Sequence, residues 1–318
     1  MTILLNNRYL IVQTLGTGDL CSTFLAQDTW VNPHRWCVVK EYGPAPTQVR
    51  LRRRVQDQFR RSATTLTELS KRSNQLPTTF SHFGRSGWFY LVREWVDGQS
   101  LSEKLQQEGP FSEALVQALL IRLLGLLDYL HSKKIIHGAI QADNIILRIR
   151  DSEPMLINFS GFKQAIYSGL PSSKQAVLPL RSNRDRLTTA ADLYDLGLTA
   201  IHLLTGILPT DLEAMRARRL MWQGYAANIS PQLVAVLNKA TELQPRNRYP
   251  SARDMLRDLW AKNLPAVYPP AYLPDPAPAV KPKSTRSGRL AKNEWLQALV
   301  PGSIIGFLIV VAFVFLRR

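Results

Sequence analysis

Two short stretches near the N-terminus have residue types that can bind phosphate. Gly16-Thr17-Gly18 lies between two β-like runs, and glycines let backbone amide groups approach a phosphate closely. Lys40 ends the next apolar run, which favours a position at a binding cleft over a position on the surface. A Gly-x-Gly pattern alone is weak evidence, so what these residues do depends on the motifs that accompany them.

The loop from His137 to Asn144 is the stretch around which the rest of the chain is organised. It follows a long helix, which apolar residues at helical spacing predict from Ser112 to Ser132. Ser112 is of the right type to cap the start of this helix. The short β-like run 145–147 follows the loop. These two elements must position the loop from either side.

Three further elements are predicted around these stretches. A helix is expected from Val49 to Ser70, because apolar residues recur there every three or four positions. The run from Asp192 to Leu208 reads as a second, buried helix, and Ser251 to Leu259 as a final one.

In order and spacing these motifs resemble the protein-kinase family, whose catalytic loop reads His-Arg-Asp-x-Lys-x-x-Asn. The resemblance is closest to the bacterial eukaryote-like serine/threonine kinases. It implies an α+β, two-lobed fold in a domain spanning 9–262, with a small β-rich N-terminal lobe and a large helical C-terminal lobe. The matching motifs are Gly16 with Gly18, Lys40, the hinge at Glu94 to Val96, His137 with Asn144, Asn158-Phe159-Ser160, Asp192 with Gly197, and Pro245 with Arg248 and Tyr249.

Four departures from the family pattern remove charged side chains from the site. Ala139 stands where the family has its catalytic Asp, and Gln141 where it has a Lys. Asn158 replaces the magnesium-binding Asp, and Ser62 replaces the Glu that pairs with the lysine. Kinase catalysis consists of positioning and electrostatic stabilisation. No catalytic residue is therefore predicted to be intact, and the resemblance implies a pseudokinase.

The resemblance also implies where a nucleotide would bind, with ATP as the expected ligand. Magnesium is not expected, because the amide of Asn158 lacks the negative charge that offsets the ion. No metal ligand is predicted. The predicted nucleotide-binding residues are Leu15, Gly16, Gly18, Thr23, Val38, Lys40, Glu94, Val96, Asn144 and Ile146.

Arg93 falls at the gatekeeper position, where the family has an apolar or uncharged side chain. With Lys40 nearby and no Glu partner, two cations would share the back of the cleft, and burying them unpaired is costly. Either Arg93 turns outward or an anion binds there. The corresponding hypothesis is that a nucleotide binds without magnesium, or that a partner's acidic group occupies the cleft.

The expected role is that of a scaffold or regulator in signalling, with a protein partner. An alternative is a weakly active or atypical ATP-dependent serine/threonine kinase, in which Asp143 is the nearest carboxylate of the loop. A nucleic-acid-binding protein is a third class, against which the fold resemblance argues.

Positive charge dominates the chain, with 40 Lys and Arg against 24 Asp and Glu. This excess favours anionic partners, or it reflects solubility together with a basic tail. The helix predicted at 49–70 contributes to the excess, as a solvated face or as a docking face for anionic lipid or an acidic partner. Its arginines are Arg50, Arg52, Arg53, Arg54, Arg60 and Arg61.

The C-terminal part predicts a linker and a membrane segment. Residues 263–294 are Pro-rich and basic, typical of a semi-rigid spacer, with a polyproline ligand as the alternative. Residues 295–318 predict a tail anchor, because Leu299 to Leu316 is uncharged and long enough to come close to spanning a bilayer. A buried core helix is the alternative. The basic flank favours a cytoplasmic kinase-like domain. Cys21 and Cys37 are expected as reduced thiols.

Overall fold

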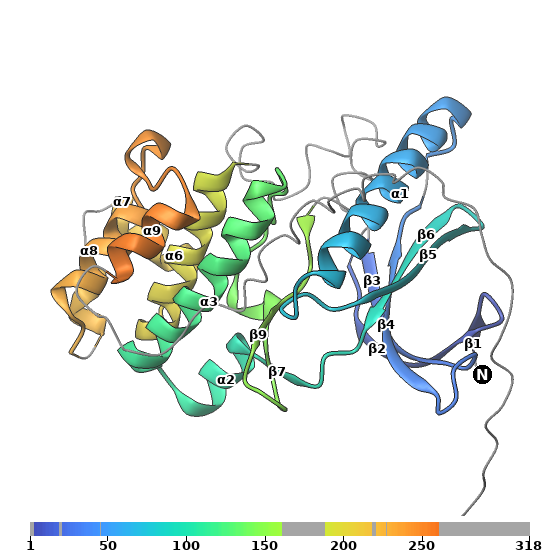
Figure 1. The fold of residues 1–318 in the computed structure, drawn as a ribbon, viewed down its shortest axis with the longest axis horizontal. Helices are drawn as coiled ribbons and strands as arrows, with labels where there is room; N and C mark the ends of the chain where they lie inside the picture. Colours follow the sequence, from blue (N-terminus) through green and yellow to red (C-terminus); the bar gives the residue numbers. More distant parts are fainter. Residues whose placement is uncertain are drawn as a thin grey trace, which may run out of the picture. The chain divides into compact units, whose positions relative to one another are not determined.

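The computed structural model describes residues 3–18, 21–44, 46–160, 188–217, 221–226 and 228–260. All of them lie in the first of the two units into which the chain divides, Met1–Leu273. They form the two-lobed α+β fold that the sequence predicts, with a β-rich N-terminal lobe and a helical C-terminal lobe (Figure 1). The predicted linker (263–294) and membrane segment (295–318) lie outside the described residues.

The N-terminal lobe is built on a six-stranded antiparallel sheet with the order β1-β2-β3-β4-β6-β5. Neighbouring strands are mostly joined by short turns, which antiparallel pairing permits. The strands are β1 (Ile3–Leu5), β2 (Tyr9–Gly16), β3 (Cys21–Asp28), β4 (Arg35–Tyr42), β5 (Thr79–Arg85) and β6 (Trp88–Glu94).

The two faces of this sheet differ, because successive side chains of a strand point to opposite sides. One face carries a small cluster that includes Cys37, Val39 and Val92. The other face packs against the main core and is here called the inner face. From β4 and β6 it carries Val38, Lys40, Tyr42, Phe89, Leu91 and Arg93.

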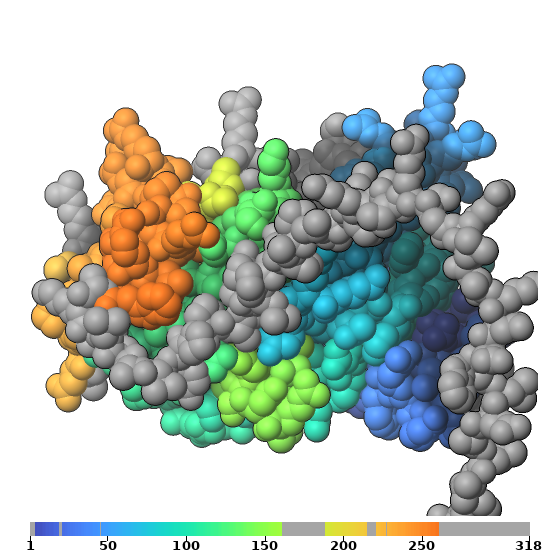
Figure 2. Space-filling view, in the orientation of Figure 1, coloured from blue at the N-terminus to red at the C-terminus, as the bar shows by residue number. Residues whose placement is uncertain are grey.

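The helix predicted at 49–70 is confirmed as α1 (Val49–Lys71). Its apolar stripe is buried in the main core, where Phe59 stacks on Phe89 with ring centroids 5.2 Å apart. The opposite side is exposed and rich in arginine, and its side chains project from the blue part of the surface (Figure 2). The first turn contains no acidic residue, and Gln48 makes no side-chain cap. The N-terminus of α1 therefore lacks the negative charge that would interact favourably with the helix dipole.

The C-terminal lobe combines a small antiparallel sheet with several helices (Figure 1). The sheet has the order β7-β8-β9, with β7 (Gly98–Ser100), β8 (Ile145–Arg148) and β9 (Pro154–Leu156). The helices are α2 (Leu101–Glu108), α3 (Glu113–Ser132), α6 (Thr189–Thr205), α7 (Pro209–Ala217), α8 (Pro231–Ala240) and α9 (Ala252–Trp260). Three short 3₁₀ turns are η1 (Ala142–Asn144), η2 (Trp222–Tyr225) and η3 (Pro245–Asn247).

Helix α3 confirms the prediction for 112–132, including the cap, because the Ser112 side chain accepts a hydrogen bond from the Leu115 backbone. Among the described residues it is the one helix long and apolar enough to cross a membrane. Its leucines are instead buried in the core of the lobe. In α6, Gly197 allows close packing on α8, because a Cβ there would meet the Thr241 methyl at 2.8 Å.

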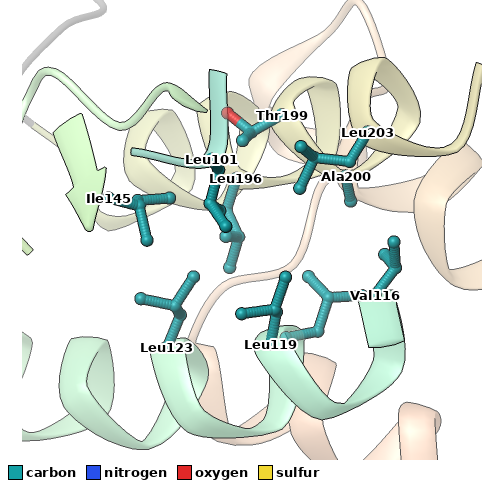
Figure 3. Close-up of a pocket in the computed structure, with 10 residues that line it drawn as sticks. Leu101, Val116, Leu119, Leu123, Ile145, Leu196, Thr199, Ala200 and Leu203 are labelled. Carbon is teal, nitrogen blue, oxygen red and sulfur yellow. The ribbon is translucent and has the colours of Figure 1, made fainter. Parts of the chain in front are cut away.

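A small apolar cavity of about 10 Å³ lies in this core, where side chains of α3 and α6 face one another (Figure 3). Leu119 and Leu123 of α3 line one side, and Leu196 and Leu203 of α6 line the other. The volume is at the lower limit for a single water molecule, and an apolar lining disfavours one. The cavity is therefore a packing gap of the large lobe and not a ligand site.

Truncating a leucine beside this gap is expected to be costly. Leu123→Ala should lower the free energy of unfolding by about 3 kcal/mol, because the new void adds to an existing one. Leu123 is 3% exposed, whereas Leu243 is 63% exposed and provides a matched control. Chemical denaturation should show a change below about 0.5 kcal/mol for Leu243→Ala. Equal losses in the two variants would contradict the assignment of the core.

Candidate functional site

Lys40 and the glycine loop are positioned by adjacent strands of the six-stranded sheet. Strands β2 and β3 form a hairpin whose connection contains Gly18. In β4, Lys40 lies directly opposite Thr23 of β3, and its Nζ atom is 3.4 Å from Thr23 Oγ1. Leu15, Gly16 and Gly18 are exposed. The structure thus brings Thr23 and Lys40 together beside an exposed loop.

The end of β6 and the segment that follows it join the two lobes, and they contain the predicted residues Glu94 and Val96. The Glu94 carboxylate accepts hydrogen bonds from the backbone N–H and the hydroxyl of Thr78, each at 3.0 Å. A ligand contact at Glu94 would therefore come from its backbone. Val96 is buried, whereas Val38 of the inner face and Ile146 of β8 are half-buried.

One of the two expectations for Arg93 is wrong, because its side chain does not turn outward. Arg93 is 4% exposed, and its Nη2 atom donates to the carbonyl oxygen of Pro77 at 2.9 Å. The reason is strand alternation, which gives Arg93 the same direction as Leu91 two residues earlier. Leu91 belongs to the core cluster of the inner face.

Asp192, at the start of α6, holds the beginning of the 137–144 loop. Its carboxylate accepts backbone hydrogen bonds from His137 at 2.9 Å and from Gly138 at 2.8 Å. The ring Nε2 of His131, at the end of α3, lies 2.8 Å from the same carboxylate. Asp192 is fully buried. One buried carboxylate therefore connects α3, the loop and α6.

His137 is a packing residue with a fixed tautomer. Its Nε2–H donates to the carbonyl of Ile157 at 2.9 Å, and its Nδ1 accepts the N–H of Ala139 at 3.3 Å. Burial lowers the pKa of His137 to about 4, so the ring is neutral at neutral pH. The ring also packs against Phe159, with centroids 4.5 Å apart.

The side-chain amides of two asparagines are hydrogen-bonded to each other at the positions where the family has metal ligands. Asn144 Nδ2 donates to the Ala139 carbonyl at 2.8 Å, so its Oδ1 must face Asn158. Asn158 Nδ2 donates to that Oδ1 at 2.8 Å. Asn158 has a φ of 65°, a left-handed conformation in which asparagine is enriched. Its own Oδ1 is buried and has no hydrogen-bond partner among the described residues.

Ser160 adds a further tie between this segment and the loop. Its backbone N–H and its hydroxyl both donate to the carbonyl of His137, at 3.0 and 2.9 Å. A glycine at this position could make only the first of these bonds. The kinase pattern that Asn158-Phe159-Ser160 resembles is Asp-Phe-Gly, so the serine fixes the segment after β9 more firmly than that glycine would.

The two positions at which the family has its catalytic Asp and Lys hold no charged side chain here. Ala139 is half-buried and contributes only its backbone, and Gln141 is exposed. Asp143, the nearest carboxylate in the loop, is exposed. Across the part of the chain that the structure describes, no three His, Cys, Asp or Glu side chains gather in a group that could hold a metal ion.

Comparison with known proteins identifies the architecture. A family model described as a protein kinase domain matches residues 9–263. The chain belongs to the protein kinase family. It is 42% identical over 270 residues to the serine/threonine-protein kinase PknA of Nostoc sp., a match that covers 81% of this chain and 48% of that protein. The chain spans about half the length of the curated relatives it matches.

Solved structures share the same fold. The chain resembles the structure titled "PpkA-294 apo form" with a TM-score of 0.60 and 21% identity, over 80% of this chain and 96% of that one. It also resembles Rad53 1-466 in complex with AMP-PNP, with a TM-score of 0.61 and 18% identity, over 80% of this chain and 65% of that one. At these identities the likeness shows the fold alone.

Sequence reasoning missed the contacts that hold this kinase-family site together. The pattern of the chain does not predict the hydrogen-bonded amides of Asn144 and Asn158, nor the two hydrogen bonds from Ser160 to the His137 carbonyl. The substitutions are visible in the sequence as Asp-to-Asn and Gly-to-Ser changes against the family pattern. Their polar, hydrogen-bonding character is the signal that could have suggested new contacts.

Proposed function

We propose that this member of the kinase family is a pseudokinase, a serine/threonine protein kinase-like protein that transfers no phosphate and acts as a scaffold or regulator in signalling. The observation that carries the proposal is the hydrogen bond from Asn158 to Asn144 beside Ala139. A kinase needs a carboxylate base and a metal-binding carboxylate at this place. Here the same positions supply a methyl group and an amide pair.

The described side chains do not fit magnesium. Mg²⁺ requires hard oxygen ligands and usually at least one carboxylate. Asn158 is neutral, and the Oδ1 atom of Asn144 already accepts a hydrogen bond from it. A metal at Asn144 Oδ1 would have to share that oxygen with the N–H group of Asn158. We therefore propose that any nucleotide binds without magnesium.

ATP remains the proposed ligand of the predicted nucleotide-binding residues. The half-buried Lys40 beside Thr23 and the exposed backbone of Gly16 and Gly18 support a phosphate site. The relative Rad53 was solved with the ATP analogue AMP-PNP. In this proposal Lys40 and the loop amides contact the phosphates, and the hinge backbone at Glu94 and Val96 contacts the base.

Thermal unfolding with ATP tests the metal dependence. We expect the full chain to be stabilised by ATP in the presence of EDTA, with no further rise in melting temperature on adding Mg²⁺. The stabilisation should follow the mass-action relation for one site and should fall in Lys40→Met. Stabilisation that appears only with Mg²⁺ would overturn the metal-free proposal.

A weakly active serine/threonine kinase is the second candidate. The observation that favours it is the 42% identity to a relative named as a serine/threonine-protein kinase. The loss of all three expected carboxylates at Ser62, Ala139 and Asn158 weighs against it. The two candidates differ in whether the isolated chain transfers phosphate.

We also propose that the kinase-like domain is held at the cytoplasmic face of a membrane. The support is the sequence itself, a domain at 9–262, a basic Pro-rich linker at 263–294 and a tail anchor at 295–318. The exposed basic side of α1, from Arg50 to Arg61, could then face anionic lipid or an acidic protein partner. The partner would be a protein of the signalling system.

A further inference from the structure

Arg93 occupies an unusual place on the inner face of the sheet. In β6 it follows Phe89 and Leu91, which belong to the core cluster with α1. It lies opposite Val38, while Lys40 lies opposite Leu91. Arg93 and Lys40 are therefore diagonal neighbours on one face, a relation in which side chains of this length can reach a common ligand.

The guanidinium group is buried, and its hydrogen bonding is incomplete. Arg93 is 4% exposed, Nη2 donates to Pro77, and Nε has no partner among the described residues. Thr79 lies opposite Arg93 in the neighbouring strand β5, is 7% exposed, and its Oγ1 atom also has no partner there. Two buried polar atoms on paired residues thus lack partners.

No described carboxylate forms an ion pair with this cation, although the nearby Glu94 carboxylate raises its pKa slightly against the effect of burial. In the described ranges, no ion pair joins Arg93 to an acidic side chain. The adjacent Glu94 carboxylate is bonded to Thr78, and Asp192 is bonded to the loop backbone and His131. On α1, the helix that packs on this face, both acidic residues are exposed.

The other groups near Arg93 bring no negative charge. From β4 these are Lys40, which is positive, and Tyr42, whose pKa burial raises well above its usual value. From the loop, His137 is neutral, and Arg93 is among the groups that lower its pKa. Burial lowers the pKa of Arg93 itself to about 10, so the guanidinium remains charged at neutral pH. Burying a cation without a paired anion lowers the stability of the fold.

We propose that Arg93 is the fixed charge of an oxyanion site on the inner face, which takes a phosphate group without a metal ion. Arg93 Nε and Thr79 Oγ1 supply hydrogen bonds, and Lys40 supplies a second positive charge. The phosphate is either free or part of a nucleotide, because both present the same oxyanion chemistry. The inference goes beyond the pseudokinase proposal, because it holds whether or not phosphate is transferred.

Thermal unfolding of the full chain in EDTA tests the site with inorganic phosphate and with ATP as separate probes. We expect phosphate to raise the melting temperature of the wild type. Arg93→Met should weaken apparent phosphate affinity at least about tenfold, because a charge-assisted hydrogen bond is lost. Without phosphate this variant should be as stable as the wild type or more stable, because an apolar side chain replaces a buried charge.

Two further variants make the outcome decisive. Arg150→Met is the matched control, because the side chain of Arg150 is 69% exposed. It should leave the response to phosphate unchanged. Thr79→Val removes the unpartnered Oγ1 atom while keeping the charge of Arg93, and it should also weaken the response to phosphate. This variant provides the test if Arg93→Met does not fold. If saturating phosphate suppresses the ATP response, the two ligands share the site; if the responses add, phosphate alone occupies it.

Two results would overturn the proposal. One is a wild type that responds to neither phosphate nor ATP in EDTA. The other is an Arg93→Met variant that keeps the full response, which would place the anion elsewhere. Because no metal and no phosphate transfer enter these measurements, their failure is distinguishable from a failure of the pseudokinase proposal.

Discussion

Asp192→Asn is expected to lower the free energy of unfolding by about 3 kcal/mol, because it breaks a buried charged network. The fully buried carboxylate accepts hydrogen bonds from the backbones of His137 and Gly138 and from the ring of His131. An amide cannot replace it, because its NH₂ group would face another donor. At least one buried N–H would then be left unsatisfied.

Asp128→Asn is the matched control for this variant. Asp128 also contacts a cation, with its Oδ2 2.9 Å from Arg253, but the two side chains are 32% and 80% exposed. Exposed pairs of this kind contribute about 0–1 kcal/mol. Denaturant titration of both variants should therefore separate them clearly. Similar midpoints for the two would mean that Asp192 does not hold the loop.

The double variant Ala139→Asp/Asn158→Asp is expected to gain magnesium-dependent phosphate transfer. A carboxylate at position 158 has no N–H to donate to Asn144, so the amide pair would open and free the Asn144 oxygen for a metal. A carboxylate at position 139 would restore the group that orients the acceptor hydroxyl. A positioned base contributes about 10²–10⁴-fold, and transfer to a generic serine/threonine substrate should rise by at least the lower end of that range.

The restored activity should disappear when Lys40→Met is added, since Lys40 is the proposed phosphate contact. Each single variant should gain less than the double variant, because base and metal act together. Ser62 is unchanged in this design, so the activity should stay below that of an intact kinase. No gain in a variant that remains folded would argue that more than these two positions limits transfer.

Much of the fold could be predicted because apolar periodicity is a local property of the sequence. The stripe of α1 that includes Val55, Phe59 and Leu66 predicts the helix to within one residue at its C-terminal end. Other local signals were missed. The Ser100-x-x-Glu103 capping box starts α2, and β1 (Ile3–Leu5) adds an edge strand before the predicted domain start.

The site was harder to predict because its chemistry depends on contacts between distant residues. Replacement of the family's Asp by Asn158 is readable from the sequence, but its bond to Asn144 requires both loops in place. The sequence prediction left open whether Arg93 turns outward or an anion binds there, although strand alternation gives Arg93 the same inward direction as Leu91. Its incomplete hydrogen bonding depends on Pro77 and Thr79, which no pattern in the sequence links to it.

The central claim is that this kinase fold is kept without phosphoryl transfer. Its most direct test is the transfer of labelled γ-phosphate from ATP by the purified full chain, with Mg²⁺ and a generic serine/threonine substrate. We expect incorporation no greater than that of Lys40→Met, into either the substrate or the protein itself. Incorporation by the wild type that Lys40→Met abolishes would contradict it and establish an active kinase with rearranged catalytic residues.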